Sequence, residues 1–295
     1  MNSSLWIVHK WYLMNCLNEM FHVALGTGTQ LVNAGYAVYG IDYEGHGKSS
    51  GLQGFVPNFD ELVIDCFEHF TSICGKVQIM NFIVYILLNA LAIVCSLLIL
   101  CLWHDGAVLV APMCKITEEM KPSPIVIKIL TLLTSVIPTW KIVPTEDIID
   151  KAIKNPEWRK EIRNNPYCYK GMIRLKTGYE LLKASLDIQD KLNEVELPFL
   201  IVHGDADSVT DPAVSQSLYE SASSKDKTFK LYPGMWHALT SGEPQESINL
   251  VFSDIIEWLN ARTESSSSRL EIEHKIAHDH QIKALHLRQL INYNL

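Results

Sequence analysis

The chain has 295 residues, of which 48% are hydrophobic and 20% are charged. This length and composition suffice for one large α/β domain and exclude a protein that is disordered throughout. The formal net charge of −8 argues against a nucleic-acid-binding protein, because phosphate backbones are bound mainly through clustered Lys and Arg.

The amino-terminal segment, residues 1–26, has only short apolar runs, which are interrupted by His9, Lys10, Asn15 and Glu19. It lacks the continuous apolar region of a signal peptide. The seven Cys are odd in number and show no C-x-x-C spacing, which favours reduced thiols over a disulfide framework or a zinc site. We therefore expect a cytoplasmic or membrane-associated protein without a signal peptide.

Residues 36–42, YAVYGID, predict a buried strand that is followed by a glycine-rich loop and a helix near residues 58–70. The loop holds the one G-x-S-x-G match in the chain, with Ser49 at its centre. A nucleophile in this motif needs a sharp strand-to-helix turn, whereas about eight loop residues separate Ser49 from the expected helix. We expect that Ser49 is not catalytic and that the match is accidental.

Residues 77–103, VQIMNFIVYILLNALAIVCSLLILCLW, contain no charged residue. The run exceeds the roughly 20 apolar residues that a membrane-spanning helix needs, so we expect a transmembrane helix. The alternative is a very hydrophobic core helix or strand, and FIVYILL (82–88) suits a strand because it is apolar and β-branched. The two alternatives exclude each other, since a span would separate the two halves of one sheet.

Further strands and helices follow this apolar run. GAVLVAP (106–112) predicts a strand, and residues 115–191 predict several short helices, because prolines interrupt their helical periodicity. Strands are predicted again at 198–204 and 228–234, and an amphipathic helix at 246–262. Strands that alternate with helices predict a parallel α/β sheet, with the 115–191 helices inserted as a cap.

After the last helix the composition changes to a Ser-rich linker and a tail over residues 263–295. His274 and His278 lie one helical turn apart and, with His280, could be considered as metal ligands. No carboxylate or Cys set completes their coordination, so we expect a solvated, partly helical tail and neither a metal nor a cofactor.

An acid and a base follow the last two predicted strands. Asp207 lies three residues after Gly204, and His237 follows the strand at 228–234. A carboxylate that orients a histidine is two-thirds of a nucleophilic triad, and the order acid-then-histidine is that of α/β-hydrolases. Asp and His are also common in such loops, so the pattern alone leaves a purely structural role open.

Longer stretches carry a family resemblance, which covers residues 27–76 and 104–262. They are LVNAGYAVYGIDYEGHGKSSGLQGFVPNFDELVID, DGAVLVAPMCKITEEMKPSP, PTWKIVP, NPYCYKG, RLKTGYELL, LPFLIVHGDADSVTD and KLYPGMWHAL. Together they resemble plant monoacylglycerol lipases and caffeoylshikimate esterases, which are α/β-hydrolases that cleave small acyl esters with a Ser-Asp-His triad.

The resemblance implies an α/β-hydrolase-like domain over residues 27–262 and an apolar acyl-binding cap over 115–191. It also implies that Asp207 is the triad acid and His237 the triad base, in preference to the neighbouring carboxylates Asp205 and Asp211. The implied substrate is a monoacylglycerol or a related acyl or hydroxycinnamoyl ester.

The chain departs from this family at two places. The family's nucleophile elbow precedes the strand that 106–112 matches, and residues 77–103 stand there instead, with Ser96 in a run without glycine that cannot make the turn. The family's H-G loop, which supplies an oxyanion-hole N–H, is also missing, because His22 is not followed by Gly. We therefore expect no nucleophile, and an incomplete sheet in which the H-G strand and the elbow strand are replaced.

Three interpretations of function stay open. The first is an ester hydrolase of this family that has become inactive. The second is a non-catalytic, membrane-associated relative that binds acyl ligands. The third is the product of a retained intron or a mis-spliced gene model, because the family motifs stop after SICGK and resume at DGAVLVAP. Sequencing the transcript across this segment distinguishes the third interpretation from the other two.

Overall fold

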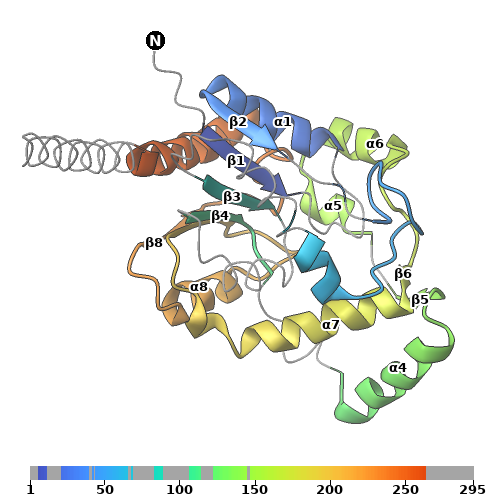
Figure 1. The fold of residues 1–295 in the computed structure, drawn as a ribbon. Coiled ribbons are helices and arrows are strands. Elements are labelled where there is room, and N and C mark those ends of the chain that lie inside the picture. The colour runs from blue at the N-terminus through green and yellow to red at the C-terminus, as the bar shows by residue number, and fades with distance from the viewer. Residues whose placement is uncertain are drawn as a thin grey trace, which may run out of the picture.

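A computed structural model of the chain describes residues 6–11, 21–39, 42, 44–65, 68, 83–88, 106–113, 122–144 and 147–263. Within these residues a six-stranded sheet has the order β2-β1-β3-β4-β7-β8, and every neighbouring pair is parallel (Figure 1). The strands are β1 (Trp6–Trp11), β2 (Tyr36–Tyr39), β3 (Ile83–Leu88), β4 (Gly106–Val110), β7 (Phe199–Gly204) and β8 (Lys227–Tyr232).

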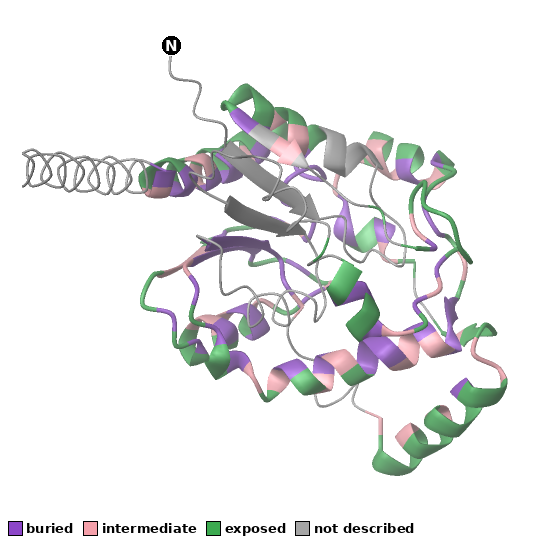
Figure 2. Cartoon of the chain, viewed as in Figure 1, coloured by how far each residue is buried: buried purple, intermediate pink, exposed green. Residues whose placement is uncertain are grey.

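The centre of the hydrophobic core lies at β4 and β7, where every residue is buried (Figure 2). Their sequences, GAVLV and FLIVHG, are nearly continuous apolar runs, as expected for parallel strands that are covered on both faces. Gly106 permits close packing at the start of β4, because a Cβ there would lie 2.7 Å from the Trp258 ring.

Helices cover both faces of this sheet (Figure 1). On one face, α1 (Phe21–Asn33) and the helix of residues 245–263 pack against β4 and β7. On the other face, α8 (Pro212–Ser221) contacts β7 and β8. The strands and helices predicted at 106–112, 198–204, 228–234 and 246–262 are thus confirmed to within a few residues.

The α/β-hydrolase-like parallel sheet is confirmed, and two segments that carry no family resemblance fill the positions between β2 and β4. Residues 6–11, from the segment without family resemblance, form β1 between β2 and β3, with Ile7 opposite both Ala37 and Ile83. β3 in turn pairs with β4, with Val84 opposite Gly106. The sequences of residues 6–11 and 83–88 are rich in the β-branched and aromatic residues that favour strands. Because β1 and β3 are each paired on both sides, the sheet is continuous from β2 to β4.

The predicted transmembrane helix over 77–103 is not supported, because residues 83–88 form β3. Among the described residues no helix combines the length and apolarity that crossing a membrane would require. Residues 77–82 and 89–103 lie outside the described part of the chain. An apolar run can satisfy its backbone hydrogen bonds in a buried parallel strand as well as in a helix, and hydrophobicity alone does not distinguish the two.

The segment between β4 and β7 forms several short helices, as predicted, together with a small antiparallel pair of strands that was not predicted. Ser123 and Asn155 cap two of the helices, and a proline follows each cap at the first helical position. The elements are α4 (Pro124–Val136), β5 (Lys141–Val143), α5 (Ile149–Ala152), α6 (Pro156–Asn164), β6 (Ile173–Arg174), α7 (Leu175–Gln189) and a 3₁₀ turn (Leu192–Glu194).

These elements lie around the carboxyl-terminal end of the sheet (Figure 1). α5 and α6 lie beyond the ends of the strands, and α7 runs below them, with α4 packed on its outer side. The carboxyl-terminal end of the sheet is where α/β folds build their ligand sites, so this segment is placed to border one.

Candidate active site

The loops that follow β7 and β8 are held together by a close backbone approach at Gly204. A Cβ at this position would lie 2.2 Å from the carbonyl oxygen of Met235, so only glycine fits. The Ala206 N–H then donates to the same Met235 oxygen at 3.1 Å. This contact brings Asp207 and His237 to the same point at the edge of the sheet.

We predict that Gly204→Ala will lower the free energy of unfolding by about 1–3 kcal/mol, the usual cost of overpacking a filled site. Gly28→Ala is the matched control, because a Cβ at Gly28 meets no atom within 4 Å and Gly28 lies inside α1. Removing this helical glycine should stabilise the protein by about 0.5–1 kcal/mol. Chemical denaturation measures both changes, and equal effects of the two substitutions would contradict the close approach.

The imidazole of His237 and the carboxylate of Asp207 form a direct pair. His237 Nδ1 lies 2.7 Å from Asp207 Oδ2, and the two side chains are 2% and 0% exposed. Because a carboxylate only accepts hydrogen bonds, Nδ1 carries the proton and donates it to Oδ2. His237 Nε2 is then left as the acceptor that a general base needs. The sequence analysis placed these two residues at the same sheet edge, where the structure brings them together; their catalytic role stays a prediction.

Asp207 accepts further hydrogen bonds from its own loop and from β7. Its Oδ1 accepts from the backbone N–H groups of Val209 at 2.7 Å and Thr210 at 3.0 Å. Its Oδ2 also accepts from Thr210 Oγ1 at 2.8 Å and His203 Nε2 at 3.0 Å. Burial acts to raise the pKa of the Asp207 carboxyl, but the hydrogen bonds from His203, His237 and the Thr210 backbone outweigh it. The pKa is held well below its ordinary range, so Asp207 is ionised at neutral pH.

The lowered pKa of Asp207 predicts a loss of stability in acid. A carboxyl whose pKa is lower in the folded than in the unfolded chain stabilises the fold above its unfolded pKa, and this contribution disappears as the pH falls toward the folded pKa. We expect the difference in free energy of unfolding between wild type and Asp207→Asn to be constant at neutral pH and to shrink below about pH 4. Urea denaturation at a series of pH values measures this difference, and a constant difference down to pH 2 would contradict the assignment.

The two neighbouring carboxylates make other contacts. Asp205 Oδ1 accepts from the Gly234 backbone N–H at 2.5 Å, and Asp211 caps α8 by accepting from Ala213 N at 2.8 Å. Neither is among the hydrogen-bond partners of His237 in the described residues. Asp207 is thus the carboxylate that the structure pairs with His237.

Three polar side chains around Asp207 were missed by the sequence analysis: His203, Thr210 and Ser215. His203 is fully buried, and its Nδ1 lies 2.7 Å from Ser215 Oγ. Thr210 Oγ1 lies 3.0 Å from His237 Nδ1. The sequence offered a signal for His203, because this polar residue follows the apolar run FLIV within the buried strand β7. A histidine there must find polar partners inside the protein.

Ser49 lies on an exposed loop, and its Oγ donates to the backbone oxygen of Asp42 at 2.6 Å. Gly47 and Gly51 on either side of it have positive φ, which makes them turn residues of the loop. The next helical residue is Phe59, where α-helical structure begins after the loop. Ser49 is therefore neither at a strand-to-helix turn nor a hydrogen-bond partner of His237 in the described residues.

β3 occupies the sheet position from which a nucleophile elbow would leave. The sequence after Leu88 is NALAIV, so no Ser, Thr or Cys follows until Cys95, and Ser96 comes one residue later. Both Cys95 and Ser96 lie outside the described residues. The residues directly after β3 thus include no side chain that could act as a hydroxyl or thiol nucleophile.

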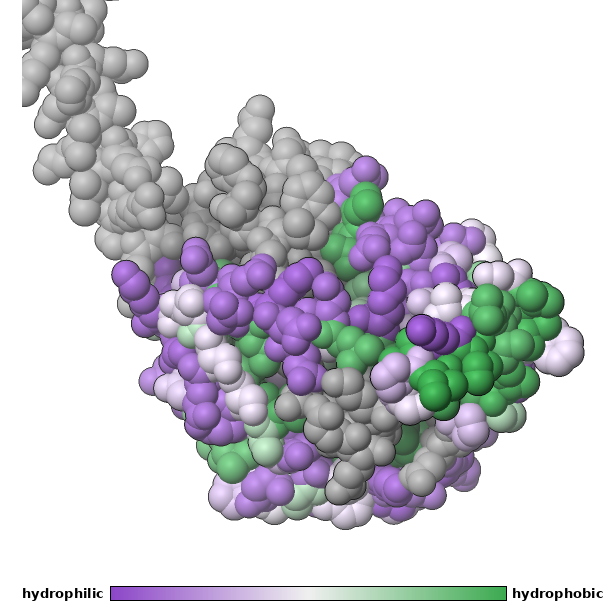
Figure 3. All heavy atoms as spheres, turned by 90° about the horizontal axis from the view of Figure 1, so that it is seen from below, coloured by the Kyte–Doolittle hydropathy of each residue, from purple (hydrophilic) through white to green (hydrophobic). Residues whose placement is uncertain are grey.

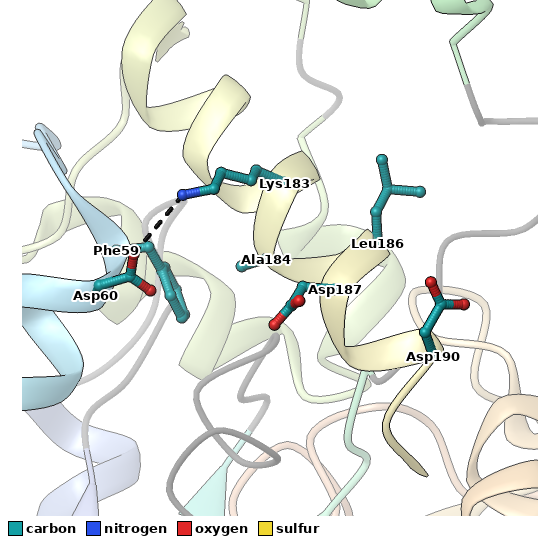
Figure 4. A pocket seen from close by; sticks show the side chains of 7 residues that line it. All are labelled: Phe59, Asp60, Lys183, Ala184, Leu186, Asp187 and Asp190. Carbon is teal, nitrogen blue, oxygen red and sulfur yellow. Dashed lines mark ion pairs between the residues drawn. The ribbon is translucent and has the colours of Figure 1, made fainter.

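A cavity of about 320 Å³ lies elsewhere, between the start of the helix at Phe59 and the side of α7 (Figure 4). Its lining does not include Asp207 or His237; the residues are Phe59, Asp60, Lys183, Ala184, Leu186, Asp187 and Asp190. The Lys183 ammonium and the Asp60 carboxylate form an ion pair across it at 3.6 Å. In the described part of the chain no cluster of His, Cys, Asp or Glu could hold a metal ion, and residues 274–280 lie outside that part.

Comparison with known proteins relates this arrangement to one family. The family model described as serine aminopeptidase, S33, matches residues 12–245. Caffeoylshikimate esterase of Arabidopsis thaliana is 33% identical over 240 residues, which are 80% of this chain and 72% of that protein. Monoglyceride lipase of Mus musculus is 27% identical over 232 residues, 76% of this chain and 73% of that protein.

Solved structures of lipases share the fold. A soluble variant of monoglyceride lipase from Saccharomyces cerevisiae, in complex with a substrate analog, matches with a TM-score of 0.73 and 20% identity, over 89% of this chain and 88% of that one. The monoacylglycerol lipase of Paleococcus ferrophilus matches with a TM-score of 0.70 and 22% identity, over 87% of this chain and 94% of that one. At these identities the structural matches establish the architecture and not the chemistry.

Proposed function

We propose a function from the premise that this chain belongs to the serine aminopeptidase S33 family of α/β-hydrolases. The protein is a monoacylglycerol lipase- or esterase-like hydrolase that has lost its catalytic activity. It retains an acid–base pair, with Asp207 as the acid and His237 as the base. Directly after β3, residues 89–94 offer no hydroxyl or thiol on which this pair could act. The result is a protein with the binding architecture of an ester hydrolase and no turnover.

One observation carries the proposal: Asp207 and His237 form a buried, hydrogen-bonded pair at the end of the sheet, and β3 is followed directly by residues 89–94, NALAIV, which contain no hydroxyl or thiol. A triad histidine activates a hydroxyl or thiol by taking its proton. Without that group, His237 Nε2 has no proton to take in the first step of ester cleavage.

The ligand we propose is a small acyl or hydroxycinnamoyl ester. Support comes from the relatives, whose names are caffeoylshikimate esterase and monoglyceride lipase. The segment from α4 to α7 borders the carboxyl-terminal end of the sheet and is the proposed cap over this ligand. One of its helices, α4, is rich in apolar residues, which an acyl-binding site requires.

A fluorophosphonate probe tests the loss of activity, because it labels an activated serine covalently. We expect the intact mass of the purified protein to be unchanged after incubation with the probe. Ser49→Ala is the control variant: an adduct on the wild type that this substitution removes would show that Ser49 is the nucleophile, and the proposal would be wrong. An adduct that persists in Ser49→Ala would locate a nucleophile elsewhere and would overturn it as well.

A second candidate function, that of a non-catalytic membrane-associated relative, is favoured by the surface of α4. Its sequence, PIVIKILTLLTSV, contains one charged residue, and apolar side chains stay exposed along it. Ile125, Leu132 and Val136 are 71%, 72% and 78% exposed, and Trp140 after the helix is also exposed. Seen from below, the molecule shows a continuous apolar patch in this region (Figure 3). Contiguous exposed apolar surface of this kind is typical of an interaction or membrane-contact site.

We predict that the wild-type chain sediments with phosphatidylcholine vesicles and that Leu132→Glu/Val136→Glu does not. Burying one such side chain contributes about 1.5–3 kcal/mol, so the double substitution should weaken binding at least about 100-fold. Val32→Glu/Leu250→Glu is the matched control, since it alters two other exposed apolar side chains, on α1 and on the helix of residues 245–263. Equal binding of the two double variants would exclude α4 as the membrane contact.

A further inference from the structure

His203 is a second imidazole on the carboxylate of Asp207, and the proposed function assigns it no role. It is 0% exposed on β7, four residues before Asp207. Its Nε2 lies 3.0 Å from Asp207 Oδ2 and 3.2 Å from the backbone oxygen of Thr210. Both partners are acceptors, so Nε2 must carry a proton. In the neutral ring Nδ1 then accepts from the hydroxyl of Ser215 at 2.7 Å, which fixes this tautomer.

Asp207 Oδ2 is therefore shared by three donors within 3.0 Å. They are His237 Nδ1 at 2.7 Å, Thr210 Oγ1 at 2.8 Å and His203 Nε2 at 3.0 Å. A carboxylate oxygen offers two lone pairs, so three donors cannot all form bonds of full strength. The Thr210 hydroxyl has a second acceptor, the backbone oxygen of Ala111 at 3.4 Å. Its bond to Asp207 Oδ2 is the shorter of the two, so the hydroxyl and the two imidazole N–H groups compete for the same oxygen.

His203 does not act by fixing the orientation of the carboxylate. The backbone N–H groups of Val209 and Thr210 already hold Asp207 Oδ1 at 2.7 and 3.0 Å. By donating to Oδ2, His203 reduces the negative charge on this oxygen that attracts the N–H of His237. Because the three side chains are 0–2% exposed, this competition takes place in surroundings of low dielectric constant, where a hydrogen bond is electrostatically stronger than in water.

We propose that His203 is a positioning residue that acts through Asp207: it donates a second imidazole N–H to Oδ2 and thereby limits the strength of the hydrogen bond between Asp207 and His237. This inference rests on the proposed function, in which Asp207 and His237 are the retained acid–base pair. A buried histidine that only fills the core would contribute to stability and leave that hydrogen bond unchanged.

The proton on His237 Nδ1 reports the strength of this bond in a ¹H NMR spectrum, because a proton in a stronger hydrogen bond to a carboxylate resonates further downfield. The signal is assigned by its loss in His237→Gln. We expect His203→Leu to shift it downfield, since the competing donor is gone. His203→Gln should leave it close to its wild-type position, because the amide N–H can donate to Oδ2 in place of the imidazole.

Ser215→Ala provides a second variant that leaves His203 in place, in case His203→Leu does not fold. Without the Ser215 hydroxyl the ring can hold its proton on Nδ1, so donation from Nε2 weakens, and we expect a smaller downfield shift. Thermal unfolding of each variant shows that it is folded. A signal that is unchanged in both His203→Leu and Ser215→Ala, or that moves upfield in either folded variant, would overturn the inference and leave the proposed function intact. The absence of any His237 signal from the wild type would overturn both.

Discussion

A short-chain acyl ester should be hydrolysed no faster by the wild-type chain than by His237→Gln. The members of a triad act as a unit, so removing the nucleophile or the histidine costs about as much as removing all three, roughly 10⁶ in turnover. Residues 89–94, directly after β3, offer no nucleophile, so the proposed function places the first loss in the wild type already. Removing the base should then have nothing further to abolish. Hydrolysis of p-nitrophenyl butyrate, followed as kcat/KM for both proteins, measures the comparison.

Asp207→Asn serves as a second reference in the same assay, because it keeps the shape of the acid and removes its charge. The comparison holds only if His237→Gln and Asp207→Asn are both folded, and circular dichroism checks that they are. A wild-type rate more than about tenfold above both variants would mean that a nucleophile works with His237, since general base catalysis contributes at least 10². The proposed loss of activity would then be wrong.

Asp207→Ala should be among the most destabilising single substitutions in the chain, with a loss of about 3–5 kcal/mol in free energy of unfolding. The carboxylate accepts from two imidazoles, one hydroxyl and two backbone N–H groups, and His203, Thr210 and His237 among the donor residues are buried. Removing it takes this acceptor away from each donor, and the two imidazoles are only 0% and 2% exposed. Urea denaturation at pH 7 measures the loss.

Asp211→Ala is the matched control for this substitution, because Asp211 lies on the same loop but is exposed and caps α8 through a single backbone N–H. Loss of such a cap costs about 0.5–2 kcal/mol. We therefore expect the free energy of unfolding of Asp207→Ala to be clearly lower than that of Asp211→Ala. Similar losses in the two variants would show that the network around Asp207 contributes no more than an ordinary helix cap.

Sequence pattern predicted the fold well where the chain forms buried strands next to helices with clear periodicity. β4 and β7 were found because apolar runs of strand length end in Pro or Gly, and β8 because the short strand pattern TFKLY ends at Pro233. β1 was not found, because Trp6–Trp11 contains His and Lys among its apolar residues and becomes a strand only through its pairing with β2 and β3. β3 was weighed as a strand but expected as a membrane span, since its apolar run satisfies both patterns.

The candidate site was predicted in part. Asp207 and His237 were expected at one edge of the sheet because adjacent parallel strands end there, and the structure places them 2.7 Å apart; their role in catalysis stays a proposal. Thr210 and Ser215 were not predicted, because Ser and Thr in loops and helix starts usually face solvent and no local pattern shows that these two turn inward. His203 carried a usable signal as the one polar residue among the apolar side chains of its strand.

The order of strands in the sheet has a consequence for how the chain folds as it leaves the ribosome. β1 and β2 are adjacent, and β3, β4, β7 and β8 are then added one after another at the same side of β1. The nascent sheet therefore grows in one direction, and each new strand leaves an unpaired edge until the next is synthesised. Chains that stop after residue 88 end with IVYILL as that edge, an apolar, uncharged and β-branched template for pairing between copies. Premature termination within the next 20 residues should therefore yield aggregates rather than soluble fragments.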